Sequence, residues 1–423
     1  MPEAERTVVW IPSGDPGWEL EAATPYDPRS VGGGLRTLYE LAAALAAAGR
    51  GVELRGVYSP AALNEVCANA GAWPELPDEQ RPPAASDTVI VPEGIEDPAV
   101  HARLTLSPAR VVLLMLGPPG LVGWPFTDGW SPPDPLTVDL DAVARPEHFR
   151  GAAALGYELW THTPGLKRAA EDAGVACRFI GNGVPGGYPT APAAKDIDLL
   201  WLRGNRWAPL ARPVVRRLSE LGVECVAAAH VGHRELIELF GRARVVLHPL
   251  RIEGHSRIGC EARAMGAVPA VLSSNRFGVG LDEAGGALAL DDASELADAV
   301  AGLLAAPDRL ARLSAAGVSS ARRQVEWAPF VERVDAALGQ RAEEPRRAAR
   351  AAIGAALRER HEATEAELAG RLADRDDARA ELERHRDWLD STNASLSWRA
   401  TAPLRAVKRS LATAGSAIYR PPA

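Results

Sequence analysis

Two glutamates eight residues apart are the residues of this chain best placed for chemistry. Glu253 follows an apolar run, and Glu261 lies in a helical pattern that opens near Ser256. If both lie at the carboxyl edge of a parallel sheet, where doubly wound proteins bind ligands, their oxygens can accept hydrogen bonds from sugar or ribose hydroxyls. The amides of Gly254, His255 and Ser256 at the helix start can hold a phosphate. Taken alone, the two glutamates also fit a solvated helix start.

Two further features are candidate ligand contacts. Gly32, Gly33 and Gly34 directly precede a strong helical pattern. Glycine lets a backbone approach a phosphate closely, so the triplet predicts an anion site, with a flexible turn as the alternative. Glu93 ends the apolar run 89–91 and is a second candidate carboxylate.

No metal site is expected. His230 and His233 have two residues between them, on a predicted loop without partners of matching kind. His101 and His162 are expected to be structural. The four cysteines form no C-x-x-C pair, which is typical of reduced, buried thiols in a cytosolic protein.

The elements that position these residues alternate regularly. Apolar strand-like runs are predicted over 7–11, 51–57, 88–91, 110–115, 158–163 and 177–180, and then over 198–202, 224–229, 244–247 and 268–272. Helical patterns lie between them, and one long helix is predicted over 318–338. Such alternation indicates parallel, doubly wound α/β sheets.

The composition divides the chain into three parts. A Pro-, Gly- and Ala-rich stretch over 186–196 reads as a linker. We therefore predict one Rossmann-like domain over 1–185, a second over 186–338, facing it across a cleft, and a charged helical tail over 339–423. Residues 341–390 carry 11 basic and 13 acidic side chains, and leucines 368, 382, 389 and 396 form a weak coiled-coil seam that would permit self-association.

Overall composition excludes several classes of protein. The chain has 423 residues, is 47% hydrophobic and carries a net charge of −8, which gives no case for nucleic-acid binding. No secretory signal and no apolar stretch of about 18 residues is present, so a cytoplasmic location is expected. Only three of 47 basic residues are lysine, which is typical of a GC-rich bacterial genome.

Several segments resemble family 4 retaining glycosyltransferases. The stretch from Glu253 through Glu261 resembles their E-x7-E motif, and the sequence EARAMGAVPAV from Glu261 resembles the pattern that follows it. FIGNGVP over 179–185 is similar to the turn before the interdomain linker of these enzymes, and GGGLR over 32–36 to their N-terminal glycine loop. The resemblance covers residues 7–338 and implies the GT-B fold, with two Rossmann-like domains.

The resemblance also implies roles at the donor site. Glu261 would bind the ribose, and Glu253 the donor sugar near the reacting carbon, with Glu93 as a second catalytic candidate. The amides over 254–257 and the loop over 32–34 would approach the diphosphate. The lysine usual in the family is missing, so Arg206 or Arg203, together with Arg257, would supply positive charge.

The expected activity is transfer of a hexose-type sugar, with retention and without a metal or other cofactor. The donor would be a nucleotide-diphosphate sugar of the UDP or GDP type, and the acceptor a glycan or a lipid-linked glycan. The segment ASLSWRATAPLR over 394–405 resembles the ends of bacterial proteins that build surface polysaccharides, and its basic and aromatic residues favour peripheral contact with the inner membrane face. A nucleotide-sugar epimerase and a non-catalytic nucleotide-sugar-binding scaffold stay open as alternatives.

Overall fold

A computed structural model describes most of the first 340 residues and part of the tail. The described ranges are 6–10, 33–55, 60–69, 73, 82–93, 95, 98–118, 137, 143–189, 194–203, 208–229, 231–275 and 277–340, with positions 366, 369–370, 373, 375, 377 and 379–387 of the tail. Residues up to 357 form one compact unit, and residues 358–423 form another.

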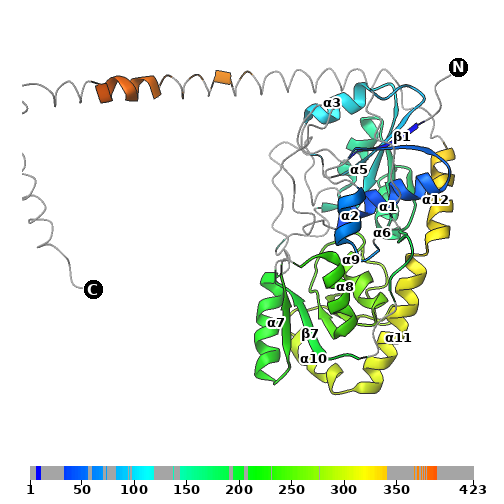
Figure 1. Ribbon diagram of the computed structural model, residues 1–423, viewed down its shortest axis with the longest axis vertical. Helices are drawn as coiled ribbons and strands as arrows, with labels where there is room; N and C mark the ends of the chain where they lie inside the picture. Colours follow the sequence, from blue (N-terminus) through cyan, green and yellow to red (C-terminus); the bar gives the residue numbers. More distant parts are fainter. Residues whose placement is uncertain are drawn as a thin grey trace, which may run out of the picture. The chain divides into compact units, whose positions relative to one another are not determined.

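The first half of the chain builds a parallel six-stranded sheet (Figure 1). Its strands are β1 (Arg6–Trp10), β2 (Gly51–Arg55), β3 (Thr88–Pro92), β4 (Arg110–Met115), β5 (Glu158–Thr161) and β6 (Cys177–Phe179). They lie side by side in the order β2-β1-β3-β4-β5-β6. Most of their residues are buried because helices cover both faces, which explains the continuous apolar runs.

Helices cover each face of this sheet. They are α1 (Gly33–Ala47), α2 (Pro60–Val66), α3 (Pro98–Leu106), α5 (Pro146–Ala154) and α6 (Pro164–Asp172). Apolar side chains of α3, α5 and α6 share one core with the sheet, and those of α1 and α2 share the core on its other face. In α1 the buried residues Leu38, Leu41 and Leu45 recur at helical spacing, so one stripe of the helix faces the strands.

The second half repeats this plan with five parallel strands. The strands are β7 (Ile197–Leu202), β8 (Cys225–Ala228), β9 (Ala243–Leu247), β10 (Val268–Leu272) and β11 (Leu288–Leu290), in the order β11-β10-β9-β7-β8. The helices are α7 (Ala208–Glu220), α8 (His233–Arg242), α9 (Arg257–Ala264), α10 (Leu296–Leu304) and α11 (Pro307–Gln324). Helices α7 and α10 pack on one face, and α8 and α9 on the other.

Both sheets have the same strand order. In the first sheet β1 lies between β2 and β3, and in the second sheet β7 lies between β8 and β9. The strand order therefore changes direction between β1 and β3 and between β7 and β9. Ligands of doubly wound proteins bind outside the carboxyl ends of the strands at such points. Glu93 directly follows β3, the loop that carries Glu253 directly follows β9, and α1 is the next described element after β1.

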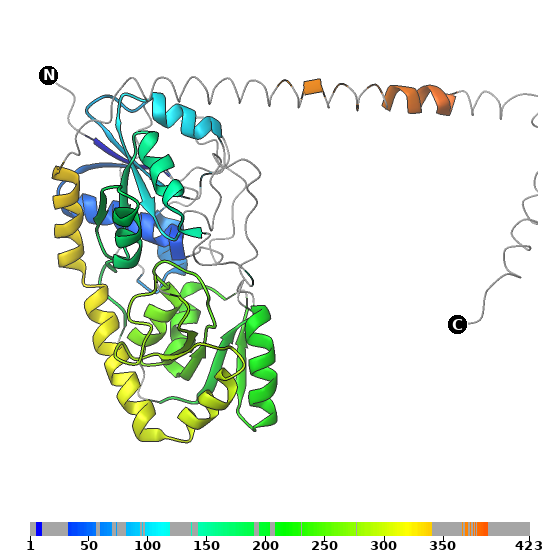
Figure 2. The ribbon, with the colours of Figure 1, turned by 180° about the vertical axis from the view of Figure 1, so that it is seen from behind.

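The last helical segment of this unit differs from the sequence expectation. Instead of one helix over 318–338, α11 ends at Gln324 and a separate helix, α12 (Trp327–Gly339), follows. The break lets the chain change direction, and α12 packs against α1 of the first half (Figure 2). Phe330 and Val334 of α12 are buried in the core that the first sheet shares with α1. The sequence pattern missed the break because Val325, between the two helices, is itself apolar and buried.

Two arginines of the first sheet hold the end of α12. Arg110 Nη1 donates a hydrogen bond to the carbonyl oxygen of Leu338 at 2.6 Å, and Arg178 Nη1 donates to that of Ala337 at 3.1 Å. Because the last carbonyls of a helix have no partner within it, these bonds satisfy them and fasten α12 to the first half.

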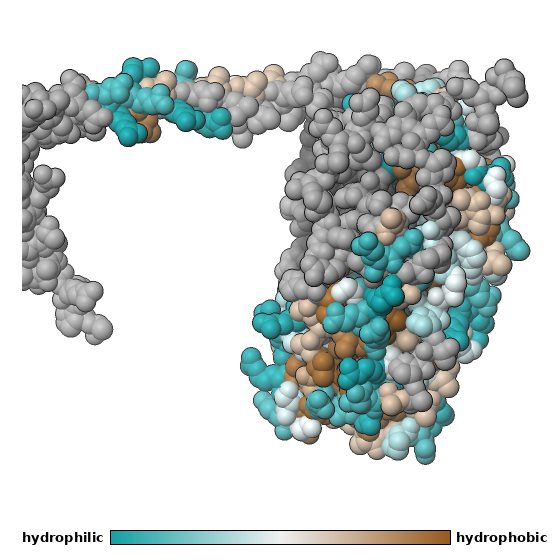
Figure 3. Space-filling model, viewed as in Figure 1, coloured by the Kyte–Doolittle hydropathy of each residue, from teal (hydrophilic) through white to brown (hydrophobic). Residues whose placement is uncertain are grey.

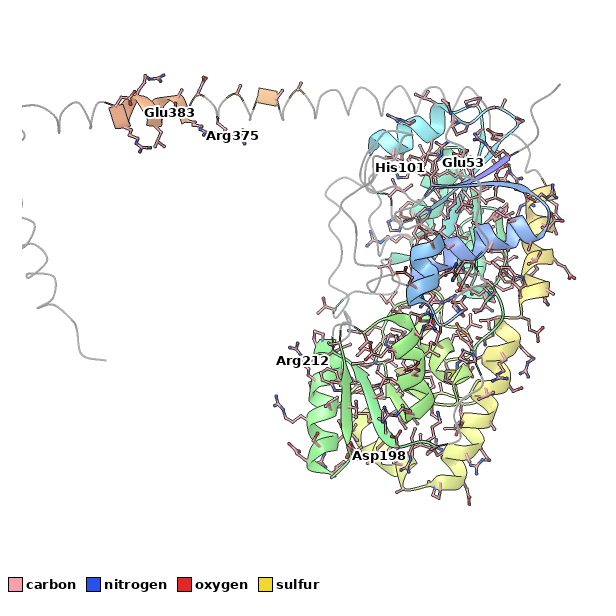
Figure 4. The ribbon with its side chains drawn as sticks, viewed as in Figure 1. Glu53, His101, Asp198, Arg212, Arg375 and Glu383 are labelled. Atoms are coloured by element: carbon pink, nitrogen blue, oxygen red, sulfur yellow. The ribbon has the colours of Figure 1, made fainter. Side chains whose placement is uncertain are left out.

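The described tail residues between 366 and 387 are helical and almost all exposed. Leu382 is 72% exposed, and Arg379 lies 3.9 Å from Glu383 in an i,i+4 pair. Figure 4 shows the side chains of Arg375 and Glu383 projecting from this segment. The coiled-coil seam stays a prediction, because three of its four leucines, at positions 368, 389 and 396, lie outside the described residues.

Hydrophilic and hydrophobic residues are interspersed over the coloured part of the second half in Figure 3. Among the described residues, no helix is both long enough and apolar enough to cross a bilayer.

Candidate functional site

The two halves meet backbone to backbone at Gly254. A Cβ atom added there would lie 2.1 Å from the carbonyl oxygen of Leu116 and 3.0 Å from the Cα of Gly117, which directly follow β4. Gly34, in the first turn of α1, also lies against the side chain of Leu116. Only glycine allows the loop before α9 to approach the first sheet this closely.

We call the surroundings of this contact the junction. It comprises Gly34, Arg36, Glu40, Glu93, Leu116, Gly117, His162, His233, Gly254, His255, Arg257 and Glu261.

Glu93 braces the strand end at the junction. Its carboxylate oxygens accept hydrogen bonds from the amides of Leu116, at 2.8 Å, and Gly117, at 2.7 Å. The side chain is buried, and burial raises its pKa to about 7 against the lowering effect of these bonds. Glu93 therefore fixes the segment against which Gly254 packs.

Glu261 lies fully buried on α9 and faces three nitrogen atoms. Its Oε1 is 2.9 Å from Arg36 Nη2, 3.3 Å from His233 Nε2 and 3.4 Å from Arg257 Nε. Burial alone would raise its pKa, but Arg36, His233 and Arg257 together outweigh burial and hold the pKa well below its usual range. The carboxylate is therefore ionised at neutral pH.

The second oxygen of Glu261 has a different environment. Both oxygens are buried, and neither accepts a hydrogen bond of good geometry from a residue in the described ranges, but Oε1 is the one that the three nitrogens approach. A buried ionised oxygen without a donor is costly, so Oε2 is suited to receive one from a ligand hydroxyl.

A second ion pair crosses the junction beside the first. Arg257 of α9 donates from both Nη atoms to the two oxygens of Glu40 on α1, each at 2.6 Å. Both side chains are buried. Removing one partner of a buried pair leaves an uncompensated charge, at a cost of about 3–5 kcal/mol, so this two-pronged contact ties α1 firmly to α9.

His233 begins α8 and completes the charge cluster. The amide of Ala68 donates to its Nδ1 at 3.2 Å, which leaves Nε2 facing Glu261 and Arg36. Burial, and next the charge of Arg36, lower its pKa to about 4, so the ring is neutral at pH 7.

Glu253 lies nearby on the loop after β9. Its Oε2 is 3.5 Å from Nε2 of the buried His248, and its amide donates to Asn275 Oδ1 at 3.2 Å. The side chain is about 20% exposed, unlike that of Glu261. Glu253 is thus the more accessible of the two carboxylates.

The start of α9 contributes amides and a histidine. The Ser256 hydroxyl accepts a hydrogen bond from the Gly259 amide at 3.1 Å and so caps the helix. The ring of His255 lies 6.3 Å from that of His162, which follows β5. Burial lowers the pKa of His162 to about 3 and that of His255 well below its usual range, so both rings are neutral at pH 7.

The structure brings most of the predicted site residues together. Glu93, Gly34, Gly254–Arg257 and Glu261 share the junction, with Gly33 at the start of α1. Gly32, Arg206 and His230 lie outside the described residues, and Arg203 is exposed. His101, on α3 (Figure 4), is hydrogen-bonded to Tyr157 Oη and to the carbonyl oxygen of Ile95, in keeping with the structural role expected for it.

Sequence reasoning missed Arg36 and Glu40 as partners of Glu261 and Arg257. A signal was present, because Arg36 and Glu40 have the same spacing on α1 as Arg257 and Glu261 on α9. Side chains four residues apart share one helix face. Two such helices can pair reciprocally, arginine to glutamate, as they do here.

Outside the junction, the first half carries a pocket of about 380 Å³ between α5, α6 and a loop of the second half. Its lining residues are Ala144, Pro146, Gly165, Arg168, Ala169, Asp172, Ala173 and Phe277. None of them belongs to the predicted site. Within the described ranges, no three His, Cys, Asp or Glu side chains come together as a metal site would require.

The chain belongs to the class of two-domain α/β proteins. Its two parallel sheets meet at the carboxyl ends of their strands, and its last helix, α12, returns to the first domain. No established family model matches the chain, and no curated protein matches it in sequence. Solved structures do match. Sucrose-phosphate synthase from Thermosynechococcus elongatus has a TM-score of 0.53 at 15% identity, over 80% of this chain and 98% of that one.

The Anabaena protein HepE, solved in complex with UDP-glucose, has a TM-score of 0.50 at 11% identity, over 79% of this chain and 99% of its own. These matches extend over both sheets, and the predicted GT-B fold is confirmed.

Proposed function

We propose that this protein is a glycosyltransferase that uses a nucleotide-diphosphate sugar. The observation that carries the proposal is Glu261, ionised and buried at the carboxyl edge of the second sheet, with neither oxygen accepting a hydrogen bond of good geometry from the described residues. Ribose hydroxyls supply such donors. The amide end of α9, the adjacent Glu253 and the glycine start of α1 would surround the diphosphate and sugar. HepE, which shares the fold, was solved with UDP-glucose, which supports a donor of this class.

The proposed reaction transfers the sugar with retention to a glycan or lipid-linked acceptor. Glu253 would bind donor sugar hydroxyls near the reacting carbon, where positive charge develops. Arginine and helix-end amides would stabilise the leaving diphosphate, so the reaction would need no metal ion. The Pro- and Gly-rich loop over 117–135 contains Trp124 and Trp130, whose rings would stack on an acceptor sugar. Its residues 119–135 lie outside the described residues.

A role in surface-polysaccharide assembly follows from the sequence of the tail. Its basic end, residues 391–423, would bring the enzyme to the inner face of the cell membrane, where lipid-linked acceptors reside. This segment also lies outside the described residues.

The proposal is tested first by binding and then by product. A thermal-shift panel of UDP, GDP and their hexose derivatives should raise the melting temperature for one base, because ligands that bind only the folded state stabilise it. The matching donor is then incubated with lipid-linked and glycan acceptors, with and without EDTA. Transfer of an α-configured sugar from an α-linked donor, unaffected by EDTA, is expected.

Other results would contradict the proposal. Binding without any product would favour a nucleotide-sugar-binding scaffold. Conversion of the donor sugar to an epimer, without an acceptor, would favour an epimerase. No shift with any nucleotide would exclude a nucleotide-sugar function altogether.

A further inference from the structure

Two arginines and two glutamates of the junction balance one another in charge. Arg36 and Arg257 oppose Glu40 and Glu261, and His233 is neutral at pH 7. All four charged side chains are buried. A diphosphate that enters this cluster adds negative charge where no positive charge is in surplus, so one of the existing ion pairs has to exchange partners.

The two arginines are held unequally. Arg257 donates a hydrogen bond from each Nη atom to the Glu40 carboxylate, at 2.6 Å. Arg36 lies 2.9 Å from Glu261 with Nη2, in an ion pair without good hydrogen-bond geometry, and its Nη1 contacts only the neutral His233 ring among the described residues. Arg36 is therefore the arginine that changes partner at the lower cost.

The partner of Arg36 is also the residue with unsatisfied oxygens. The nitrogens of Arg36, His233 and Arg257 all approach Oε1 of Glu261, but neither Oε1 nor Oε2 accepts a hydrogen bond of good geometry from the described residues. Hydroxyl groups that bind Glu261 would satisfy this carboxylate and weaken its hold on Arg36. Arg36 lies in the first turn of α1, two residues after Gly34, and is therefore close to the glycines that begin this helix.

From this geometry we infer that Arg36 is the exchangeable cation of the donor site. Arg36 pairs with Glu261 in this structure, and when ribose hydroxyls occupy Glu261 it turns to the diphosphate. Glu40 keeps Arg257 in place throughout. The inference rests on the proposed function, because it requires a nucleoside diphosphate as ligand.

The test separates the charged part of the ligand from the ribose. Dissociation constants are measured by calorimetry for UDP and uridine, or for GDP and guanosine if the protein binds that base, with wild type and Arg36→Met. The quantity compared is the preference for the diphosphate, which is the nucleoside constant divided by the diphosphate constant. Loss of a charge-assisted contact should lower this preference about tenfold or more. Arg36→Lys, which keeps a positive charge, should recover part of it.

Arg50→Met is the matched control. Arg50, which follows α1, also forms an ion pair, with 2.6 Å between its Nη2 and Oδ1 of Asp335 on α12. Its side chain is about one-third exposed and lies outside the junction. Its loss should leave the preference unchanged. If Arg36→Met leaves the preference within about twofold of wild type, Arg36 serves only Glu261 or the contact between the halves, and the inference is wrong.

A second variant covers the case in which Arg36→Met does not fold. Glu261→Gln releases Arg36 without removing it, so uridine affinity should fall while the preference for the diphosphate rises. An unchanged or lower preference in Glu261→Gln contradicts the inference. A wild-type protein that binds neither UDP nor GDP instead contradicts the proposed function, before any variant is compared.

Discussion

The backbone of Gly254 in the second half lies so close to Leu116 in the first that a Cβ atom would sit 2.1 Å from the Leu116 carbonyl oxygen. This contact sets the spacing between the start of α9 and the end of β4. It is made by backbone atoms, so a side chain at position 254 cannot be accommodated by a rotamer change.

Gly254→Ala should therefore separate the halves locally. Overpacking of this kind costs about 1–3 kcal/mol, so the melting temperature should fall, and nucleotide binding should weaken because the amides before α9 move away from α1. Gly302→Ala in α10 is the control, since open space surrounds that position and alanine favours helix by about 0.5–1 kcal/mol. Nucleotide affinity in Gly254→Ala equal to that of the control would show that the contact does not shape the site.

Glu253→Gln should lower turnover without lowering nucleotide affinity. The change keeps the shape of the side chain beside His248 but removes its negative charge. If that charge stabilises the developing positive charge on the sugar, kcat should fall about 100-fold or more, while UDP or GDP binds as in wild type. Steady-state kinetics and calorimetry measure the two effects separately. Full turnover in this variant would move the role to another group, with Glu93 as the first candidate.

Glu93→Gln should change how stability depends on pH. Burial raises the pKa of Glu93 from 4.5 to about 7, so the folded protein keeps this proton over a range in which the unfolded chain has lost it. The resulting stabilisation is fully present below pH 4.5 and is lost as pH rises through about 7. Its size is about 3 kcal/mol, because each unit of pKa shift corresponds to about 1.4 kcal/mol.

Urea unfolding of wild type and Glu93→Gln between pH 5 and 8 measures this effect. The difference in unfolding free energy between the two proteins should shift in favour of the glutamine variant as pH rises. A difference that does not depend on pH would mean that Glu93 titrates near its ordinary value.

Deletion of residues 391–423 should affect membrane binding but not the site. The segment carries five basic and no acidic side chains, and each basic residue near an anionic surface contributes about 1 kcal/mol. The truncated protein should keep its melting temperature and nucleotide affinity but no longer sediment with anionic liposomes at low salt. Binding of the full chain should weaken as salt is raised. If the full chain ignores such liposomes, a protein partner becomes the better explanation for the tail.

Local patterns in the sequence were enough to predict most of the fold. The runs that became β1, β3, β4, β9 and β10 are continuously apolar because both faces of each strand are covered, and this property can be read without knowledge of the neighbours. The break between α11 and α12 could not be read in this way. Its residue Val325 is buried like a helical core residue, and only packing of α12 on the first half explains the change of direction.

The residues of the candidate site also divide into those that the sequence predicted and those that only the structure revealed. Glu253, Glu261 and the glycines were found because their spacing, and the segments around them, are local features of the chain. The partners of Glu261 and Arg257 were not, because 217 residues separate Arg257 from Glu40. Helical spacing shows that each arginine shares a face with its glutamate, but not which two faces meet. Only the tertiary structure decided that α1 and α9 pair reciprocally, since burial of all four charges is tolerable only when opposite charges are brought together.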